Sequence, residues 1–465
     1  MPSKKTEWNM ERIKTIHLVG VGGCGMSGLA KVLHEMGYRV SGSDVREGPN
    51  TIRLTDLGVK VYIGHEDSHV RGIDLLIYSS AVGKDNPELK QARTNGIPVI
   101  KRAEMLSWIM NQSKNRIAVA GTHGKTTTSA MIAKMLDFGQ LAPTYFIGCD
   151  MDYIEGNARL GNGKFSVAEA DESDSSFLFL SPTVGIITNI ESDHMEKFGT
   201  MTALIRTFEQ FAKNISPEGF LLVDANDQNN QQLMKKLKAR FITYGLSGSA
   251  EYTARDMRFK EFGSRFTLLR SGQELGQVEL IVPGWQNVLN CLPVFAIGFE
   301  FGLDFNSIAG ALRTFVGARR RFQTVGEIND ILIVDDYAHH PTEIRATLSA
   351  ARSGWPDKRL ICIFQPHRYS RTILLKDEFT KAFDDADKIV ITDIYAASEK
   401  PIPGISGQTI ADGIKGRDVL YVPKKEGIVE HLMQDIKPGD LIMTLGAGDI
   451  YTVGKELFAR LKLHK

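Results

Sequence analysis

One segment constrains this chain more than any other: an apolar strand pattern runs into a glycine-bounded turn that is followed by a lysine. Arg116 to Thr128 read RIAVA-GTHG-KTTT, so the turn and the helix start contain Gly121, Thr122, His123, Gly124, Lys125, Thr126 and Thr127. Glycines let backbone N–H groups close around phosphate oxygens, and the following helix directs its positive end at the same anion. Lys125 can reach the β- and γ-phosphates, and the Thr126 hydroxyl can hold Mg²⁺. The turn is shorter than GxxxxGK[ST], yet the segment predicts a site for ATP or GTP.

Alternating strand and helix patterns predict an α/β fold with parallel sheets, and 465 residues suffice for about three domains of roughly 150 residues. We expect domains at 1–112, 113–316 and 317–465, with a linker at 111–115. The predicted strands are 15–20, 39–44, 59–63, 74–80 and 97–100, then 116–120, 165–170, 184–190, 220–224 and 240–244, then 331–336, 360–364, 388–392 and 440–445. A long apolar helix is expected at about 285–301, after Pro283 and Gly284.

Composition excludes several classes of protein. A formal charge of +1 argues against general nucleic-acid binding. The four cysteines are far apart and form no CxxC pair, which argues against a disulfide framework or a zinc site and fits a reducing cytosol. The start MPSKKTEWNMERIK has no apolar core for a signal peptide, and no stretch approaches the roughly 20 apolar residues of a membrane span. We expect a cytoplasmic protein without membrane insertion.

A second glycine loop, GVGGCG at 20–25, follows the first predicted strand, and Asp44 closes the next strand. Taken alone, this spacing is a dinucleotide-binding fingerprint. A glycine turn and a helix dipole hold any pyrophosphate, however, so the motif does not choose between NAD and a nucleotide-diphosphate sugar. A tight strand-to-helix turn without a ligand is the plainer alternative.

Acidic and histidine residues follow two predicted strands of the central domain. In EADESD (169–174), Glu169 is the candidate Mg²⁺ ligand, and the neighbouring acids are expected to be partly at the surface. In NIESDH (189–194), Asp193 and His194 are placed to reach the metal or the reacting phosphate. Both motifs stand where strands of open α/β sheets present residues to ligands.

Basic and histidine-rich motifs mark the third domain. ARRRF (318–322) is either a solvated surface or a clamp that stabilises charge on a transferring phosphoryl group. DDYAHHP (335–341) and FQPHRYSR (364–371) both follow apolar strands. Arg368 and Arg371 suit bidentate recognition of carboxylate or phosphate. Five of the 11 histidines fall in these motifs and those above: His123, His194, His339, His340 and His367.

Taken in order, these motifs resemble those of the Mur ligase family, which builds the peptide stem of bacterial cell-wall precursors. The resemblance covers essentially the whole chain and is carried by HLVGVGGCGMSGLA, SGSD, GTHGKTTT, EADESD, NIESDH, PGWQNVLN, RRRFQ, DDYAHHPTEI, FQPHRYSRT, PIPG and LGAGDI. It implies a Rossmann-like first domain for a UDP-sugar, a central ATPase domain with a parallel or mixed sheet, and a Rossmann-like, doubly wound third domain that closes over both.

The resemblance also assigns residues. It implies UDP-sugar binding by Gly22, Gly23, Gly25, Met26, Asp44, Ser79, Ser80 and Arg102. It implies ATP binding by the residues of the phosphate loop, 121–127, with Asn287, Asn290, Arg321 and Asp336, the last as a ribose contact. The amino acid falls to Tyr337, His339, Arg368 and Arg371, the metal (Mg²⁺, with Mn²⁺ as the alternative) to Thr126, Glu169 and His194, and catalysis to Lys125, His194, His339, His367 and Arg320.

The chain departs from the family pattern at two positions. The family usually has histidine before the first asparagine of its adenine-contacting segment, and here the residue is Gln286. Glutamine keeps a donor and an acceptor but does not stack as imidazole does. Cys24 occupies a variable position inside the first glycine loop, and the dipole of the following helix suggests a reactive thiol.

The implied reaction joins UDP-N-acetylmuramate to L-alanine at the expense of ATP, through an acyl-phosphate, and a weak homodimer is a further expectation. His339 or His367 either acts as the base or only orients the amino acid. Three alternatives are weighed against this: a recycling ligase of the same family that attaches a tripeptide to the same sugar, an NAD-dependent dehydrogenase with an accessory ATPase domain, and a nucleotide-gated binding protein. No hydride-transfer motif supports the second, and mere gating does not need substrate-facing groups on two domains.

Overall fold

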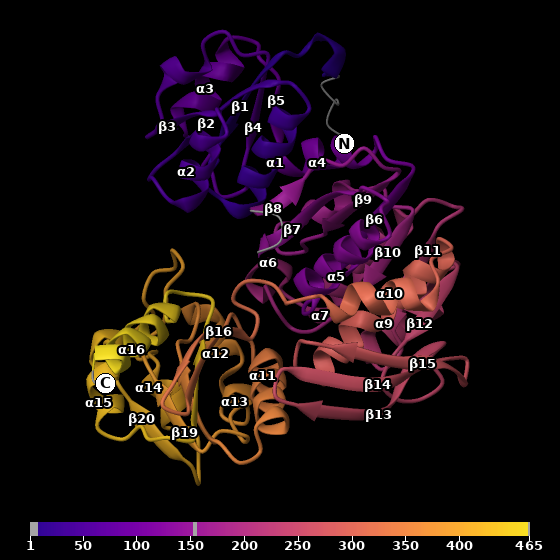
Figure 1. Ribbon diagram of the computed structural model, residues 1–465. Helices are drawn as coiled ribbons and strands as arrows, with labels where there is room; N and C mark the ends of the chain where they lie inside the picture. Colours follow the sequence, from indigo (N-terminus) through magenta and orange to yellow (C-terminus); the bar gives the residue numbers. More distant parts are fainter. Residues whose placement is uncertain (1–7, 152–155, 464–465) are drawn as a thin grey trace. The chain divides into compact units, whose positions relative to one another are not determined.

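The computed structural model describes residues 8–151 and 156–463, and these form two compact units (Figure 1). Within the described residues, one unit comprises 8–151, 156–190, 201–243 and 300–303, and the other comprises 191–200, 244–299 and 304–463. The first seven residues of the amino terminus, where no signal peptide is expected, lie outside the described residues. The α/β class is confirmed, whereas the domain borders at 112/113 and 316/317 stay predictions.

The amino-terminal part of the first unit is a parallel five-stranded sheet in the order β3-β2-β1-β4-β5. Its elements are β1 (Thr15–Val19), α1 (Cys24–Glu35), β2 (Arg39–Asp44), α2 (Pro49–Asp56), β3 (Lys60–Ile63), β4 (Leu75–Tyr78), α3 (Pro87–Thr94), β5 (Val99–Lys101) and α4 (Arg102–Met110). Met26, Leu29, Ala30 and Leu33 on α1 are buried, as their shared helix face predicts. All five strands predicted for this domain are present.

The same unit holds a second sheet, whose strands run in the order β12-β11-β10-β6-β9-β7-β8. Its elements are β6 (Asn115–Ala120), α5 (Lys125–Phe138), β7 (Thr144–Met151), β8 (Gly156–Arg159), β9 (Phe165–Glu169), β10 (Val184–Ile187), α7 (Met201–Lys213), β11 (Phe220–Asp224), α8 (Gln228–Lys236) and β12 (Phe241–Tyr244). Strands β6, β9 and β10 pair in parallel, so the loops after them meet at one edge. This edge carries the phosphate loop, the acidic motif at 169–174 and, after β10, Asn189.

The second unit combines three antiparallel strands with a six-stranded sheet in the order β16-β17-β21-β18-β19-β20. Its first elements are α6 (Met195–Phe198), β13 (Tyr252–Lys260), β14 (Gly263–Arg270), β15 (Gln273–Leu280), α9 (Trp285–Glu300, whose last residue belongs to the first unit) and α10 (Phe305–Arg313). The six-stranded sheet is parallel except for β16, which runs antiparallel to β17.

The remaining elements build the layers around that sheet. They are β16 (Gln323–Ile328), β17 (Ile331–Asp336), α11 (Pro341–Gly354), β18 (Arg359–Phe364), α12 (Tyr369–Leu374), α13 (Lys376–Phe379), β19 (Lys388–Ile391), α14 (Gln408–Ala411), β20 (Asp418–Tyr421), α15 (Ile428–Met433), β21 (Asp440–Leu445) and α16 (Tyr451–Leu463). Apolar clusters lie on both faces of the sheet, one around Phe364 and Phe379 and the other around Ile363 and Leu457. The predicted doubly wound arrangement is thereby confirmed.

The structure differs from the sequence-based expectation in a few elements. The predicted linker at 111–115 is partly wrong, because Asn115 already pairs with Phe165 as the first residue of β6. Strands β7, β8, β13, β14, β15, β16 and β20 were not predicted. Helix α9 continues through Pro293, in a segment where the buried apolar residues on both sides of the proline hold the helix together by packing. Among the helices of the described chain, none is long and apolar enough to cross a bilayer.

Asp224 at the end of β11 makes the stability of this protein depend on pH. Burial, opposed by a hydrogen bond from the Asn226 N–H, raises the pKa of Asp224 from 3.8 to about 6. The folded protein therefore holds this proton more tightly than the unfolded chain, and stability falls as the pH rises from about 4 to 6. We expect Asp224→Asn to raise the free energy of unfolding at pH 8 by up to about 3 kcal/mol, and the melting temperature with it.

The matched control for this variant is the pH series itself. At pH 4 the parent carboxyl is already neutral, so parent and Asp224→Asn should melt at similar temperatures when followed by differential scanning fluorimetry. A stabilisation of equal size at pH 4 and pH 8 would show that the charge of Asp224 is not the cause.

Candidate functional site

The phosphate loop lies between β6 and α5, and its backbone is fixed by residues at the end of β10. Gly121 (φ +126°) and Gly124 (φ +84°) adopt left-handed conformations, and a Cβ at Gly121 would collide with the Thr188 hydroxyl. The Thr122 N–H donates to the Asn189 carbonyl at 2.9 Å, and the His123 N–H donates to the Asn189 side-chain oxygen at 2.9 Å. Both glycines are thus needed for the loop conformation, and Asn189 holds its middle.

Lys125 stands at the start of α5, where its side chain is 12% exposed and ion-paired. Its ammonium lies 2.9 and 3.0 Å from the two Glu172 carboxylate oxygens and also donates to the Gly121 and Thr122 carbonyls at 2.5 and 3.1 Å. Burial acts to lower the pKa of Lys125, but the carboxylates of Glu172, Asp171 and Glu169 outweigh it and raise that pKa. The lysine is therefore charged at neutral pH. Glu172 is 2% exposed, so the expectation that the acids beside Glu169 lie partly at the surface is wrong for this residue.

Thr126 at the amino end of α5 and Glu169 at the carboxyl end of β9 form a pair of candidate oxygen ligands. The Thr126 hydroxyl donates to Glu169 Oε2 at 2.9 Å. Gly148 on β7 makes room for this carboxylate, because a Cβ there would collide with it. Hydroxyl and carboxylate oxygens are the ligands that Mg²⁺ prefers, so this donor set fits the ion. His194, the third predicted ligand, belongs to the second unit, and its metal role stays a prediction.

A pocket of about 330 Å³ in the first unit brings the first glycine loop and the acidic motif at 169–174 together. Its wall on the amino-terminal side includes the predicted UDP-sugar residues Gly23, Gly25, Met26, Ser79, Ser80 and Arg102. Its other wall includes Glu169, Asp171 and Asp174 from the acidic motif. Arg102 approaches the first loop so closely that a Cβ at Gly25 would lie 3.0 Å from its guanidinium. The pocket thus combines a pyrophosphate-type loop, an arginine and a metal-type carboxylate.

The end of β2 supports the first glycine loop. Asp44 Oδ2 accepts the Gly22 N–H at 2.8 Å, and the Ser43 carbonyl accepts the N–H groups of Gly20 and Val21 at 2.8 and 3.0 Å. Asp44 therefore orders the loop, in addition to its predicted role as a ligand contact. Its contact with the loop follows from the parallel pairing of β1 with β2, which sets the loop beside the strand end.

The structure contradicts the expectation that the Cys24 thiol is reactive. Cys24 begins α1, where a helix dipole favours a thiolate, but burial and the nearby Asp150 and Glu169 carboxylates raise the pKa of its thiol to about 12. The thiol donates to the Gly148 carbonyl at 3.1 Å, and the Asn157 amide lies 3.1 Å from the sulfur. All four cysteines are free, so no disulfide competes with this arrangement.

We therefore expect a thiol reagent to label Cys24 at least about tenfold more slowly than the same cysteine in urea, since only the thiolate reacts. The measurement is site-resolved alkylation at pH 8, followed by mass spectrometry of the Cys24 peptide. Labelling of the native protein as fast as the denatured one would contradict the raised pKa.

A second pocket, of about 290 Å³, lies within the second unit. It is lined by Asp193, His194, Glu196, Arg368, Ser370 and Arg371, together with Leu374 and Leu375. The Arg371 guanidinium binds Asp193 Oδ1 at 2.7 and 3.2 Å, and Arg368 binds Glu196 at 2.8 Å. Burial acts to raise the pKa of Asp193, but Arg371 and His194 outweigh it and hold that pKa well below its usual range. The pocket therefore pairs fixed positive and negative groups, as a zwitterionic amino acid requires.

Two histidines beside this pocket have distinct hydrogen-bonding states. His367 Nδ1 lies 3.0 Å from the Arg371 guanidinium, which can only donate, so Nδ1 accepts and Nε2 carries the proton. His339 Nδ1 lies 3.0 Å from the Tyr337 carbonyl and 3.2 Å from Glu343 Oε2, which both accept, so Nδ1 carries the proton and Nε2 has a lone pair. Burial is the main cause that lowers the pKa of His339 to about 4 and that of His367 to about 3. Both rings are neutral at pH 7, and only His339 presents an accepting Nε2.

Two arginines of the cluster at the start of the third domain, Arg320 and Arg321, make different contacts. The guanidinium of Arg320 binds Asp335 at 2.9 Å and the carbonyls of Gly446 and Gly448 at 2.6 and 3.1 Å. These contacts suit a structural role and count against Arg320 as the arginine that stabilises a transferring phosphoryl group, although that role stays a prediction. Arg321 stands 5.3 Å from the Tyr337 ring and 3.5 Å from Glu343.

Asp336 is engaged by the backbone around it. Its two carboxylate oxygens accept the N–H groups of Ala338 and Phe322, each at 2.7 Å, and burial raises its pKa to about 6. A ribose hydroxyl would have to share these oxygens, so the predicted ribose contact remains untested. The Tyr337 ring packs against His339 at 5.3 Å, which supports a shared place for these two predicted amino-acid contacts.

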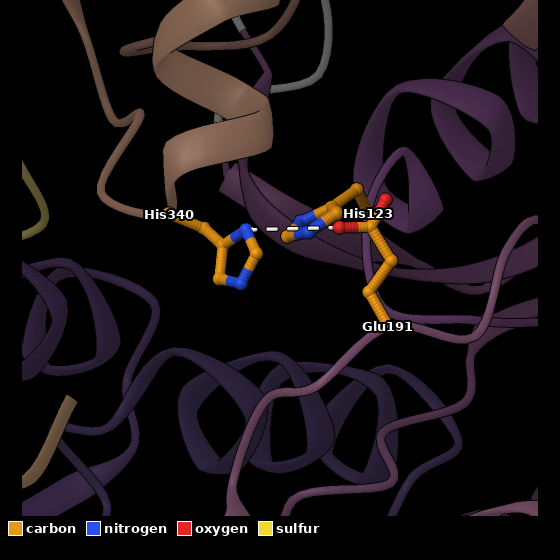
Figure 2. Close-up of side chains that lie close together, drawn as sticks. All are labelled: His123, Glu191 and His340. Atoms are coloured by element: carbon orange, nitrogen blue, oxygen red, sulfur yellow. Dashed lines mark ion pairs between the residues drawn. The ribbon is translucent and has the colours of Figure 1, made fainter. Parts of the chain in front are cut away.

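The segment 191–194 and the start of α11 meet in the second unit. Glu191 Oε2 accepts the Thr342 hydroxyl at 2.6 Å and forms an ion pair with His340 Nδ1 at 3.9 Å (Figure 2). Glu343 on the next turn accepts the N–H groups of His339 and His340 at 3.0 and 3.3 Å. Glu191, Thr342 and Glu343 were not among the predicted site residues. Only their position beside the predicted histidines could have suggested them.

The predicted adenine segment begins α9. The Asn287 amide donates to the Pro283 carbonyl at 2.7 Å, which fixes the helix start. Gln286 Oε1 is buried and has no hydrogen-bond partner within the described chain. Such an oxygen can accept from an exocyclic amino group of a base, although glutamine does not stack as imidazole does. The adenine contacts of Gln286, Asn287 and Asn290 stay predictions.

Family models match three consecutive parts of the chain. Residues 15–114 match the Mur ligase family, catalytic domain; residues 119–298 match the Mur ligase middle domain; and residues 320–448 match the Mur ligase, glutamate ligase domain. Together these matches cover the phosphate loop, both pockets and the histidines described above. The three-domain α/β architecture follows from this order.

Individual relatives match almost the full length. The UDP-N-acetylmuramate–L-alanine ligases of Geotalea uraniireducens and Geobacter sulfurreducens are 48% and 46% identical to this chain; each alignment covers 97% of it, and 99% and 98% of the respective relative. The crystal structure of UDP-N-acetylmuramate-alanine ligase from Thermotoga maritima is similar with a TM-score of 0.83 at 32% identity, covering 97% of this chain and 100% of that one. A murein peptide ligase from Psychrobacter arcticus shares the fold, with a TM-score of 0.69 at 24% identity and coverage of 96% and 98%.

Proposed function

Because this chain belongs to the Mur ligase family, we propose that it is an ATP-dependent ligase that joins the lactyl carboxylate of UDP-N-acetylmuramate to L-alanine. The observation that carries the proposal is the pocket of about 330 Å³ in which the first glycine loop and Arg102 face Glu169. There a UDP-sugar would meet the nucleotide site through its carboxylate. Full-length identity of 48% to a relative of that name supports the same substrates.

The reaction needs activation, because a carboxylate does not react with an amine at neutral pH. The lactyl carboxylate attacks the γ-phosphate of ATP, which breaks the bond to the β,γ-bridging oxygen and gives an acyl-phosphate and ADP. The amine of L-alanine then attacks the acyl carbon, and phosphate leaves with the electrons of the C–O bond. Lys125 leaves Glu172 for the phosphates and offsets negative charge on the transferring group. Closure of the domains excludes water from the acyl-phosphate.

The metal and the histidines have separate tasks in this scheme. Thr126 and Glu169 would hold Mg²⁺, or Mn²⁺ in its place, with His194 as a third ligand; the ion would neutralise phosphate charge. His339 accepts the proton that the attacking amine loses, because its Nε2 has the lone pair. His367 donates from Nε2 and orients the amino acid with Arg368 and Arg371. The different hydrogen-bonding states of the two histidines support this division of roles, which the sequence leaves open.

We further propose the cellular role and location of this ligase. A ligase with these substrates acts in peptidoglycan precursor synthesis, and so in cell-wall biogenesis, cell shape and cell division. We propose a cytoplasmic location, where ATP and the UDP-sugar are available, and at most a weak homodimer, which sedimentation velocity at several concentrations would test.

One assay panel tests the function. UDP-N-acetylmuramate, ATP and Mg²⁺ are supplied with each single amino acid and with an L-alanyl tripeptide, and phosphate release and ligated product are measured. We expect product with L-alanine. Product with the tripeptide alone would favour a recycling ligase, and NADH binding without UDP-sugar binding would favour a dehydrogenase. Failure to form ADP or product with any acceptor would overturn the proposal.

A further inference from the structure

A buried carboxylate, Glu88, holds together the loops on one side of the first sheet. Glu88 is fully buried near the start of α3, and its two oxygens are approached by three imidazoles and a hydroxyl. His69 Nδ1 lies 2.7 Å from Oε1, and His65 Nδ1 lies 2.9 Å from Oε2. His17 Nε2 lies 3.5 Å from Oε1, and the Ser43 hydroxyl donates to Oε2 at 2.7 Å. A carboxylate only accepts, so each nitrogen that binds it carries a proton.

The partners of Glu88 come from elements that are separate in the sequence. His17 is on β1, Ser43 is on β2, and His65 and His69 follow β3. Burial acts to raise the pKa of Glu88, but the nearby His17 and the hydrogen bonds from Ser43 and His69 outweigh it and lower that pKa to about 2. His69 also stacks on Tyr62 of β3, with ring centroids 4.0 Å apart. The carboxylate is thus charged throughout the physiological range and fixes the loop after β3 against the middle of β1 and the end of β2.

Ser43 and Asp44 connect the hydrogen bonds around Glu88 to those of the first glycine loop. The Ser43 hydroxyl binds Glu88, while the Ser43 carbonyl accepts the N–H groups of Gly20 and Val21. The next residue, Asp44, binds the Gly22 N–H with its side chain and accepts the Gly64 N–H with its carbonyl at 2.8 Å. Gly64 immediately precedes His65. The strand end Ser43–Asp44 is therefore held between the first glycine loop and the loop after β3. Glu88 binds Ser43 at this strand end and also binds the histidines of the loop after β3.

We propose that Glu88 is a positioning residue for the UDP-sugar site: through Ser43 and His65 it fixes the strand end and the loop that together set the first glycine loop for the pyrophosphate. Glu88 does not touch the ligand. The inference rests on the proposed function for the identity of the ligand, while the hydrogen bonds that carry it lie wholly within the protein.

A glutamine at this position would be a poor substitute. It offers one accepting oxygen in place of two, and its amide N–H groups would face imidazole N–H groups. We expect Glu88→Gln to raise the KM for UDP-N-acetylmuramate at least about tenfold, since buried donors lose their acceptor. The kcat and the KM values for ATP and L-alanine should change less than about twofold, because phosphate-loop and amino-acid residues do not contact Glu88.

The chain offers a matched control on the same loop. Glu66 lies 3.9 Å from His69 Nε2, but its side chain is 72% exposed. Glu66→Gln removes a carboxylate beside the same histidine and should leave every KM unchanged. Ser43→Ala, which deletes the 2.7 Å hydrogen bond to Glu88 without burying a new donor, should raise the KM for the UDP-sugar alone, by about three- to tenfold. Ser43→Ala carries the test if Glu88→Gln does not fold.

A second readout needs no ligand. In the full chain labelled with ¹⁵N-histidine, the Nδ1–H resonances of His65 and His69 should shift in Glu88→Gln and stay in place in Glu66→Gln.

Isothermal titration with UDP-N-acetylmuramate separates the positioning role of Glu88 from the proposed function. If the parent binds the sugar and a folded Glu88→Gln or Ser43→Ala variant binds it equally well, the positioning role is overturned and the proposed function stands. If the parent does not bind the sugar, the proposed function fails and the role of Glu88 toward that ligand fails with it.

Discussion

Replacement of Lys125 by alanine is expected to lower ATP-dependent phosphate release by about a thousandfold or more. The ammonium is the charged group of the phosphate loop that can follow the γ-phosphate, and contacts of this kind stabilise charge that develops during phosphoryl transfer. The measurement is phosphate release at saturating ATP, UDP-N-acetylmuramate and L-alanine. Lys134→Ala, on the same helix α5, is the control and should keep near-normal turnover.

Loss of folding must be separated from loss of chemistry in this variant. Lys125 pairs with the buried Glu172, so Lys125→Ala leaves a carboxylate without its counter-ion, which costs several kcal/mol of stability. The double variant Lys125→Met/Glu172→Gln removes both charges and keeps the volume of the two side chains. It should melt close to the parent and still lack turnover. A folded double variant with near-normal phosphate release would contradict the role of the lysine.

The phosphate loop also shows how far the sequence could predict the site. The glycines, Lys125 and Thr126 are adjacent in the chain, and their spacing alone determines a turn whose geometry the structure confirms. Glu172 and Asn189 lie 47 and 66 residues from their partners Lys125 and His123, so their contacts depend on which strands become neighbours. Parallel pairing of β6 with β9 and β10 produces those contacts. Sequence patterns predict strands more readily than strand order.

The missed strands have a local cause. In β13 the burial pattern alternates only in part, and the pairing with β14 shifts between Arg255 and Arg258. A bulge changes which side chains face the core, so the two-residue period that identifies a strand is interrupted. Strand β14 contains a second shift, between Leu268 and Leu269, in its pairing with β15. By contrast, buried parallel strands such as β17 and β21 are continuous apolar runs, and the sequence predicted both.

His339→Gln and His367→Gln are expected to affect different steps of the reaction. His339 has an accepting Nε2, because Tyr337 and Glu343 hold the proton on Nδ1. Its loss should lower kcat by about a hundredfold or more with little change in the KM for L-alanine. His367 accepts from Arg371 at Nδ1 and can only donate at Nε2. Its loss should raise the KM for L-alanine and change kcat by less than about fivefold.

A partial reaction locates the His339 step. If His339 acts only when the amine attacks, His339→Gln should still form the acyl-phosphate, seen as a rapid release of about one ADP per enzyme before steady turnover. His431→Gln, at an exposed histidine of the same unit, is the matched control and should behave as the parent. Since the pKa of His339 is about 4, the ring is neutral above pH 5, and the ratio of parent to variant kcat should be constant between pH 6 and 9. A His367→Gln variant that loses kcat while His339→Gln keeps it would reverse the two roles.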